Sequence, residues 1–249
     1  MCNKVFDEYG KYYDLLYKDK DYKAEAGYVA GIIKKFLPNS KEILELGCGT
    51  GKHARELALL NYNVFGIDLS KNMISEAKKL GIECEVGDVR NYRMKKKFDV
   101  VISLFHILSY QTTNRDVEEF FETARYHLKD NGILIFDVWY GPAVLKQLPE
   151  KRTKNLEDDE IKVVRHCEPD IKLEAHVVDV NYTLEILNKI NNLQKVIKET
   201  HSMRYFSDDE IKEFASDHGF DIILTEEWMT HNEPSEKTWG VCFVGRKVN

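Results

Sequence analysis

The sequence predicts an α/β fold: a doubly wound, mostly parallel seven-stranded sheet with an antiparallel β insertion. Two observations predict the sheet. Short apolar runs alternate with amphipathic helical patterns up to residue 140, and glycine-containing turns lie between them. A third observation predicts the insertion: in parts of residues 148–203, apolar and polar residues alternate with the period of two that is typical of strands. The 249 residues suffice for one such domain, with residues 38–147 and 204–249 forming the core sheet.

The chain ahead of the sheet, residues 1–37, is expected to form a helical lid. It is rich in aromatic residues, and Tyr9, Tyr13 and Leu16 follow one another at helical spacing. A second amphipathic stretch ends at Pro38, which cannot continue a helix.

Strands and helices alternate between residues 42 and 139. Strands are predicted at residues 42–47, 62–68, 82–88, 98–105 and 133–139, and helices at residues 51–61, 70–81 and 116–132. Ser70 is a suitable N-cap for the second helix, and Asn131-Gly132 predicts the end of the third.

The pattern changes after Gly141-Pro142. Antiparallel strands of the insertion are predicted at residues 161–169, 172–187 and 194–206, and the last core strands at residues 221–228 and 239–247. Between these groups, Ser207 followed by Glu210 predicts a capping box for a helix over residues 207–220.

Charge and cysteine content exclude several classes of protein. A net charge of −6 disfavours a nucleic-acid binder, and the one dense basic run, residues 93–97, is interpreted as a solvated loop. The five cysteines, at positions 2, 48, 84, 167 and 242, form no CxxC pair, which argues against a disulfide framework or a zinc site. The N-terminus lacks the apolar core of a signal peptide, and no apolar run approaches the roughly 18 residues of a membrane span. We therefore expect a soluble, cytoplasmic protein.

The stretch ILELGCGTGKHARELA, residues 43–58, places three glycines between a strand and a helix. A phosphate loop needs glycine where this chain has Leu46 and a hydroxyl residue where it has His53. A dinucleotide loop needs a third glycine where Lys52 stands. The remaining interpretation is a nucleoside ligand without a phosphate at the loop.

Two carboxylates support the nucleoside interpretation. Asp68 ends the second strand, where it can accept both ribose hydroxyls, and Asp88 follows the third, where it can accept the exocyclic amine of adenine. Ligands of open α/β sheets bind at the carboxyl ends of the strands, and all three elements lie there.

The segments ELGCGTG, GIDLS, GDV, FDVVIS and LKDNGILIFDVW resemble the ordered motifs of class I S-adenosylmethionine-dependent methyltransferases over about residues 40–140. Outside this region, YYDLLYKDKDYKAEA and KETHSMRYFSDDE, together with GTGKH, resemble the N-methyltransferases that act on nucleotide-linked aminosugars. The resemblance implies a seven-stranded Rossmann-like methyltransferase fold, S-adenosyl-L-methionine as cofactor, a small-molecule acceptor and, by analogy, a homodimer.

The resemblance also implies roles for individual residues. Gly47 and Gly49 would line the methionine part of the cofactor, and Asp68 would hold the ribose. Leu69 would lie beside the adenine, which Asp88 and Val89 would bind. Leu104 would lie near the reactive end, and Tyr13 and Tyr22 of the lid would contact cofactor or substrate. His53 also matches a histidine of the aminosugar enzymes, without an assigned role.

The acceptor is less clearly marked than the cofactor. Residues 104–107 contain no proline, which disfavours the amino-methylating nucleic-acid enzymes, and Asp137 has no obvious acidic partner for a metal site. His106 and Tyr110 remain as candidate catalytic residues, although Tyr110 stands where the aminosugar enzymes carry a histidine. His201 is interpreted as part of the fold of the insertion. An amino group on a nucleotide-linked deoxysugar is the best single prediction, and another N or O acceptor, or tRNA, remains the alternative.

Overall fold

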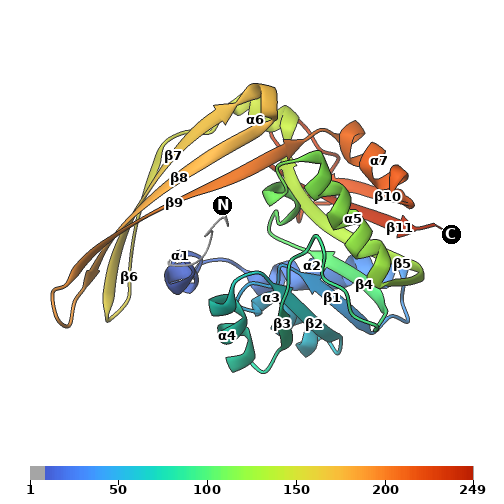
Figure 1. Cartoon of the computed structure of the whole chain (residues 1–249), viewed down its shortest axis with the longest axis horizontal. Helices are drawn as coiled ribbons and strands as arrows, with labels where there is room; N and C mark the ends of the chain where they lie inside the picture. The colour runs from blue at the N-terminus through green and yellow to red at the C-terminus, as the bar shows by residue number, and fades with distance from the viewer. Residues whose placement is uncertain (1–8, 249) are drawn as a thin grey trace.

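The structure is a computed structural model that describes residues 9–248, and its core is a seven-stranded sheet (Figure 1). Five strands are parallel: β1 (Glu42–Leu46), β2 (Asn63–Asp68), β3 (Glu83–Val86), β4 (Phe98–Ser103) and β5 (Leu128–Tyr140). Next to β5 lies the antiparallel strand β11 (Gly240–Lys247), which pairs with β10 (Phe220–Glu227). The core order is therefore β3-β2-β1-β4-β5-β11-β10, and the predicted fold class is confirmed.

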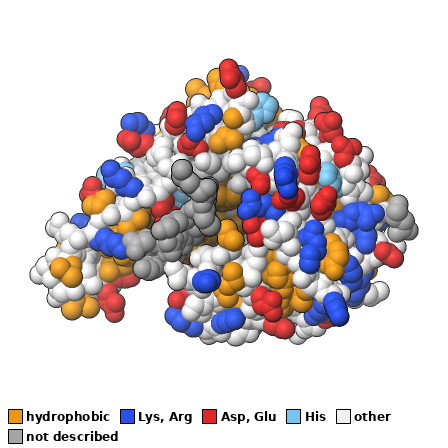
Figure 2. All heavy atoms as spheres, in the orientation of Figure 1, with side chains coloured by type: hydrophobic (Ala, Val, Ile, Leu, Met, Phe, Trp, Pro, Cys, Tyr) orange, Lys and Arg blue, Asp and Glu red, His pale blue; other side chains and the backbone are white. Residues whose placement is uncertain are grey.

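Helices cover both faces of this sheet. On one face, α2 (Tyr22–Phe36) and α3 (Lys52–Leu59) pack against Ile43 of β1. On the other face, α5 (Asn114–His127) and α7 (Asp208–Asp217) form one apolar cluster with Leu44 of β1. Successive residues of a strand point to opposite faces, so a strand covered on both sides is apolar throughout. The helix α4 (Lys71–Lys79) packs beside α3. Figure 2 shows Lys/Arg and Asp/Glu side chains intermingled over one face of the molecule.

Two serines begin helices as the sequence predicts. The Ser70 hydroxyl accepts the Met73 N–H at 3.4 Å, and the Ser207 hydroxyl accepts the Glu210 N–H at 3.2 Å. The Glu210 carboxylate binds Arg204 of the preceding strand. The side chain of Glu210 thus joins α7 to its neighbouring strand.

The helix predicted to end at Asn131-Gly132 ends earlier, at His127. Leu128 already pairs with Phe98 of β4, and pairing resumes at Ile133 after a bulge. A side chain at position 132 would place its Cβ 2.9 Å from the Asp99 carbonyl oxygen. The glycine therefore serves the close approach of two strands, a tertiary contact that helix-ending signals do not encode.

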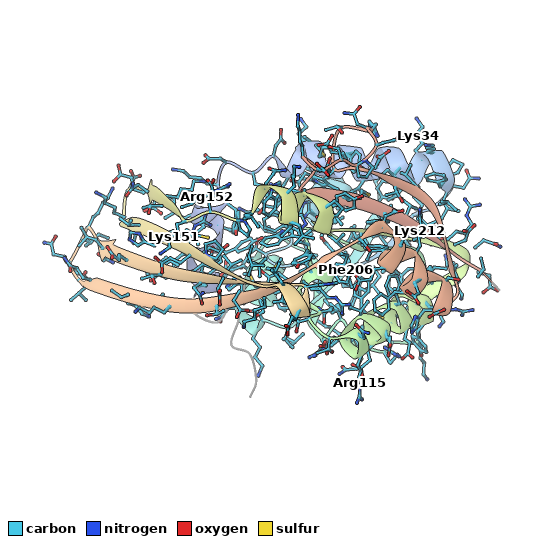
Figure 3. All side chains as sticks on the ribbon, turned by 90° about the horizontal axis from the view of Figure 1, so that it is seen from above. Lys34, Arg115, Lys151, Arg152, Phe206 and Lys212 are labelled. Carbon is cyan, nitrogen blue, oxygen red and sulfur yellow. The ribbon has the colours of Figure 1, made fainter. Side chains whose placement is uncertain are left out.

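The insertion is an antiparallel sheet that we call the flap, formed by β6 (Arg152–Glu157), β7 (Ile161–Lys172), β8 (Val177–Asn188) and β9 (Gln194–Phe206). It projects from the core, and Phe206 lies where it joins the core sheet (Figure 3). There, Tyr205 and Phe206 pair with the end of β5. The sequence analysis missed β6 and the short helix α6 (Gly141–Gln147), whose first turn accommodates Pro142. A short 3₁₀ turn, η3 (Leu173–Ala175), precedes β8.

The described part of the lid begins with the 3₁₀ turn η1 (Tyr9–Tyr12) and the helix α1 (Tyr13–Leu16). Residues 1–8, which include Cys2 and Phe6, lie outside the described residues. Tyr9, Tyr13 and Leu16 form one apolar cluster with Met73 of α4 and with side chains of the flap, among them Val163. The lid is thus packed between the core and the flap. Within residues 9–248, no helix is long and apolar enough to cross a bilayer.

Phe136 is a sensitive point of the core. Its ring is fully buried in β5 and contacts the rings of Phe120, Phe121 and Phe243. We expect Phe136→Ala to lower the free energy of unfolding by about 3–5 kcal/mol, because it removes buried apolar surface and leaves a cavity. Urea unfolding measures this difference. Leu59→Ala, at an exposed position, is the control and should change it by less than about 0.5 kcal/mol; equal effects of the two substitutions would contradict the packing described.

Candidate active site

A pocket lies at the carboxyl ends of β1, β2 and β4, with lid residues on one side. Its lining includes seven residues predicted from the sequence: Tyr13, Tyr22, Gly47, Gly49, Asp68, Leu104 and Tyr110. Tyr17, Lys52, His53, Phe105 and Ile107 also line it, although the sequence analysis assigned them no site role. The other predicted residues, Leu69, Asp88, Val89 and His106, are not part of this lining.

The glycine loop is bound to the end of β2. The N–H groups of Gly47 and Cys48 both donate to the Ile67 carbonyl at 2.8 Å. Gly47 has a φ of +78°, and a Cβ there would lie 2.6 Å from the Ile107 side chain, so only glycine fits. At Gly49 an added Cβ would meet open space, which leaves the backbone at this point accessible to a ligand.

Asp68 organises the same loop from the end of β2. Its carboxylate accepts the Gly49 N–H at 3.0 Å and the Ser70 N–H at 2.8 Å. Burial raises the pKa of Asp68 above its ordinary value, and these two hydrogen bonds act in the opposite direction. A carboxylate has about four acceptor sites, so two backbone donors leave capacity for the hydroxyls of a ligand.

The lid is attached to the glycine loop by polar contacts. Asp14 of α1 accepts the Thr50 hydroxyl at 3.1 Å and pairs with the Lys52 ammonium at 2.9 Å. The Lys52 ammonium also lies 5.3 Å from the centre of the Tyr22 ring. The lid tyrosines therefore approach the pocket through contacts made by residues of the loop itself.

A second connection passes through His53, whose role the sequence left open. Its Nε2 lies 2.7 Å from Glu25 of α2, and its ring packs edge-on against Tyr22. Burial raises the pKa of Glu25, but hydrogen bonds from His53 and Lys20 outweigh that effect and lower it. His53 thus holds the long lid helix against the first helix of the core.

Glu45 lies on β1 beneath the loop and is almost fully buried. Its Oε1 is 3.8 Å from Nδ1 of His53, which is beyond hydrogen-bonding distance. Burial, reinforced by the nearby charge of Asp68, raises the pKa of Glu45 to about 8. This buried acid was not singled out from the sequence, because its chemistry depends on surroundings that only the fold supplies.

Asp88 and its neighbours lie outside the pocket lining. Both Asp88 oxygens accept hydrogen bonds from the Arg90 guanidinium, at 2.9 and 2.6 Å, and Arg90 also binds Asp116 at 2.8 Å. Burial opposes ionisation of Asp88, but the Arg90 contacts prevail and lower its pKa. The Val89 side chain packs in the core cluster, and Leu69 is 57% exposed.

The two candidate catalytic residues face different surroundings. Phe105 and His106 both have left-handed backbone angles, φ +65° and +63°, and this turn places His106 Nδ1 2.7 Å from the buried carboxylate of Asp137. Tyr110, at the end of the 3₁₀ turn η2 (Leu108–Tyr110), lines the pocket, and its hydroxyl lies 3.0 Å from Nδ1 of His201 in the flap. Among the described residues, no group of three or more His, Cys, Asp or Glu side chains is placed to hold a metal ion.

Comparisons with known proteins agree with this geometry. Residues 43–132 match the family model described as a methyltransferase domain. Over 134 residues the chain is 30% identical to a dTDP-3-amino-3,4,6-trideoxy-alpha-D-glucopyranose N,N-dimethyltransferase of Streptomyces venezuelae, an alignment that spans 52% of this chain and 56% of that relative. A putative methyltransferase of Geobacillus sp. (strain WCH70) is 26% identical over 98% of this chain and 100% of its own length.

The fold is similar to that of an S-adenosylmethionine-dependent methyltransferase from Clostridium acetobutylicum ATCC 824, with a TM-score of 0.81, 21% identity and coverage of 98% and 99% of the two chains. The fold, the domain match and the relatives agree: residues 43–132 match a methyltransferase domain, and the chain is similar to S-adenosylmethionine-dependent methyltransferases. Within that class it resembles the N,N-dimethyltransferases of dTDP-linked aminosugars, although the chain spans only about half the length of those relatives.

Asp68 can be tested through its charge. We expect Asp68→Asn to weaken binding of S-adenosylhomocysteine by roughly 10- to 100-fold, because a hydrogen bond to a charged group contributes about 1.5–3 kcal/mol. Since burial raises the pKa of Asp68, wild-type affinity should also decrease as the pH is lowered and the carboxylate becomes protonated, and this dependence should be weaker in the variant. Calorimetric titration measures both effects. The exposed Asp209→Asn is the control, and unchanged affinity in Asp68→Asn would exclude the proposed contact.

Glu45 predicts a dependence of stability on pH. With its pKa raised to about 8, the folded protein keeps this proton up to higher pH than the unfolded chain, whose carboxyl titrates near 4.5. The folded state then binds more protons between these values, so this group lowers the free energy of unfolding as the pH rises. Glu45→Gln cannot ionise, and we expect its stability relative to wild type to increase between pH 5 and 8 in urea unfolding. A difference that is constant with pH would show that Glu45 titrates normally.

Proposed function

We propose that the protein transfers the methyl group of S-adenosylmethionine to an amino group of a nucleotide-linked deoxysugar. The observation that carries the proposal is the pocket at the strand ends, where the glycine loop and Asp68 face the tyrosines of the lid. The 30% identity to an aminosugar N,N-dimethyltransferase supports the choice of acceptor.

The residues at the pocket could bind the parts of the cofactor in the order that the sequence predicts. The open backbone at Gly49, with Gly47 beside it in the loop, would receive the methionine part, and the remaining acceptor capacity of Asp68 would receive the ribose hydroxyls. The exposed Leu69 would be covered by the adenine. Asp88 would have to bind the adenine amine while keeping Arg90, which the number of its acceptor sites permits.

The bound cofactor supplies an electrophilic methyl group on a sulfonium. The protein then has to align the acceptor nitrogen with that methyl group and keep water out. Leu104, Phe105 and Ile107 provide an apolar wall near the reactive end, and Phe105 packs edge-on against Tyr17 of the lid. An amine also has to lose a proton, so a polar side chain on the acceptor side is needed.

Of the two predicted catalytic residues, the geometry favours Tyr110. Tyr110 lines the pocket and its hydroxyl has a partner in the flap, whereas His106 faces Asp137. We propose that Tyr110 contacts the acceptor and that His106, held by Asp137, fixes the turn that forms the apolar wall.

The alternative acceptors, the cellular location and the oligomeric state are also proposals. Transfer to another N or O acceptor, or to tRNA, is the alternative, and the net charge of −6 weighs against tRNA. A reducing, cytoplasmic location is supported by Cys48, Cys84, Cys167 and Cys242, which are all free thiols. The flap packs against the lid, which favours a flap that covers the site. Exposed apolar residues of the flap, such as Ile190 and Leu193, could be buried between the subunits of a homodimer, which light scattering would detect.

The acceptor proposal is tested with defined sugars. Incubation with S-adenosylmethionine and dTDP-linked 3-amino- or 4-amino-deoxysugars should add one or two methyl groups, as measured by mass spectrometry. The matching hydroxy sugars and unmodified tRNA serve as controls and should remain unmethylated. Methylation of the controls alone, or of no aminosugar by a protein that binds S-adenosylhomocysteine, would refute this acceptor.

A further inference from the structure

A buried chain of side chains runs from the pocket into the flap. The Tyr110 hydroxyl lies 3.0 Å from His201 Nδ1, and His201 Nε2 lies 3.4 Å from a Glu199 oxygen. His201 and Glu199 both belong to β9, and their side chains are only 4% and 10% exposed. The flap therefore presents an imidazole, with a carboxylate behind it, to the one pocket-lining residue that we place next to the acceptor.

The surroundings hold this chain in place. The His201 ring lies 5.1 Å from the Tyr9 ring and 5.0 Å from the Tyr182 ring, centre to centre. Glu199 accepts the backbone N–H of Tyr9 at 2.9 Å, which orients the carboxylate. The titratable groups in contact with His201 include these two tyrosines, Tyr110 and Glu199. The Arg165 guanidinium donates to the Tyr9 hydroxyl at 3.2 Å and lies 5.4 Å from the centre of the Tyr182 ring.

Tyr110 alone is poorly suited to remove a proton. Burial raises its pKa well above the ordinary value for a phenol, so the hydroxyl stays protonated at neutral pH. A protonated phenol can accept a second proton only if it passes its own to another base. Imidazole is the side chain whose ordinary titration falls between pH 5 and 8, and a base oriented by a third group is a recurrent arrangement in catalysis.

We propose that His201 is a positioning residue that takes up the acceptor's proton through Tyr110, an inference that rests on the proposed amine methylation. As the N–CH₃ bond forms and the S–CH₃ bond breaks, the amine proton moves to the Tyr110 oxygen, and the Tyr110 proton moves to His201 Nδ1. The positive charge of the sulfonium is thereby replaced by a proton on the imidazole, next to the Glu199 carboxylate. The tyrosine is unchanged at the end of the step.

The main test is the pH dependence of kcat, with a dTDP-linked aminosugar as the acceptor. His201→Gln can still accept the Tyr110 hydrogen bond but cannot take a proton at neutral pH. We expect kcat to fall by roughly 100-fold, as for loss of a general base. The decrease of kcat at low pH that the relay predicts for wild type should disappear, and KM for S-adenosylmethionine should change less than about twofold.

His166→Gln is the matched control, because His166 also lies on the flap but is exposed and contacts Thr153. It should keep the wild-type kcat and pH profile. A purely structural role for His201 would lower kcat without altering its pH profile, and that result would overturn the proposal, as would a His201→Gln enzyme with wild-type kinetics.

A second measurement separates this proposal from the choice of acceptor. If wild type methylates no aminosugar, the proposed function is rejected, and the relay is then decided by the NMR titration of His201 in the complex with S-adenosylhomocysteine. We expect the imidazole signals of His201 to change with pH and this change to differ in Tyr110→Phe, which lacks the hydroxyl that contacts Nδ1. Signals that do not change with pH, or that are indifferent to Tyr110→Phe, would overturn the relay.

Discussion

The arrangement of the site depends on the hydrogen bonds that join the glycine loop to the end of β2. Gly47 and Cys48 donate to the Ile67 carbonyl, and Gly49 donates to the Asp68 carboxylate. These contacts link the neighbouring parallel strands β1 and β2 at their carboxyl ends. These hydrogen bonds hold the loop against the end of β2. The backbone at Gly49 can therefore face a ligand, and no side chain covers it there. Lid, turn and flap are all positioned relative to this junction.

The pocket is completed by segments that are distant in sequence. The lid reaches the loop through the pairs Asp14–Lys52 and Glu25–His53, and it packs against the flap through Tyr9 and its neighbours. The flap in turn reaches the pocket through Tyr110. The lid and the flap therefore stabilise each other beside the pocket.

Buried acids are concentrated at the carboxyl ends of the strands. Glu45 and Asp137 are buried on β1 and β5, and Asp68 is partly buried at the end of β2. Burying a carboxylate is costly unless a cation or donors are close. The cofactor that we propose carries a sulfonium and an ammonium group and would supply positive charge at this edge. Burial raises the pKa values of both Glu45 and Asp68.

The sequence by itself determined the α/β class and nearly every strand, because strand periodicity, helix caps and glycine spacing are local properties. Its resemblance to methyltransferase motifs indicated seven residues that line the pocket. Tertiary structure decided the rest. The end of α5 was set by strand pairing at Leu128, and His106 was turned toward Asp137 by two left-handed residues. His201, interpreted from the sequence as part of the flap's fold, lies beside Tyr110, 91 residues away in the chain. Contacts between such distant residues arise from the packing of the flap on the core, which no local pattern encodes.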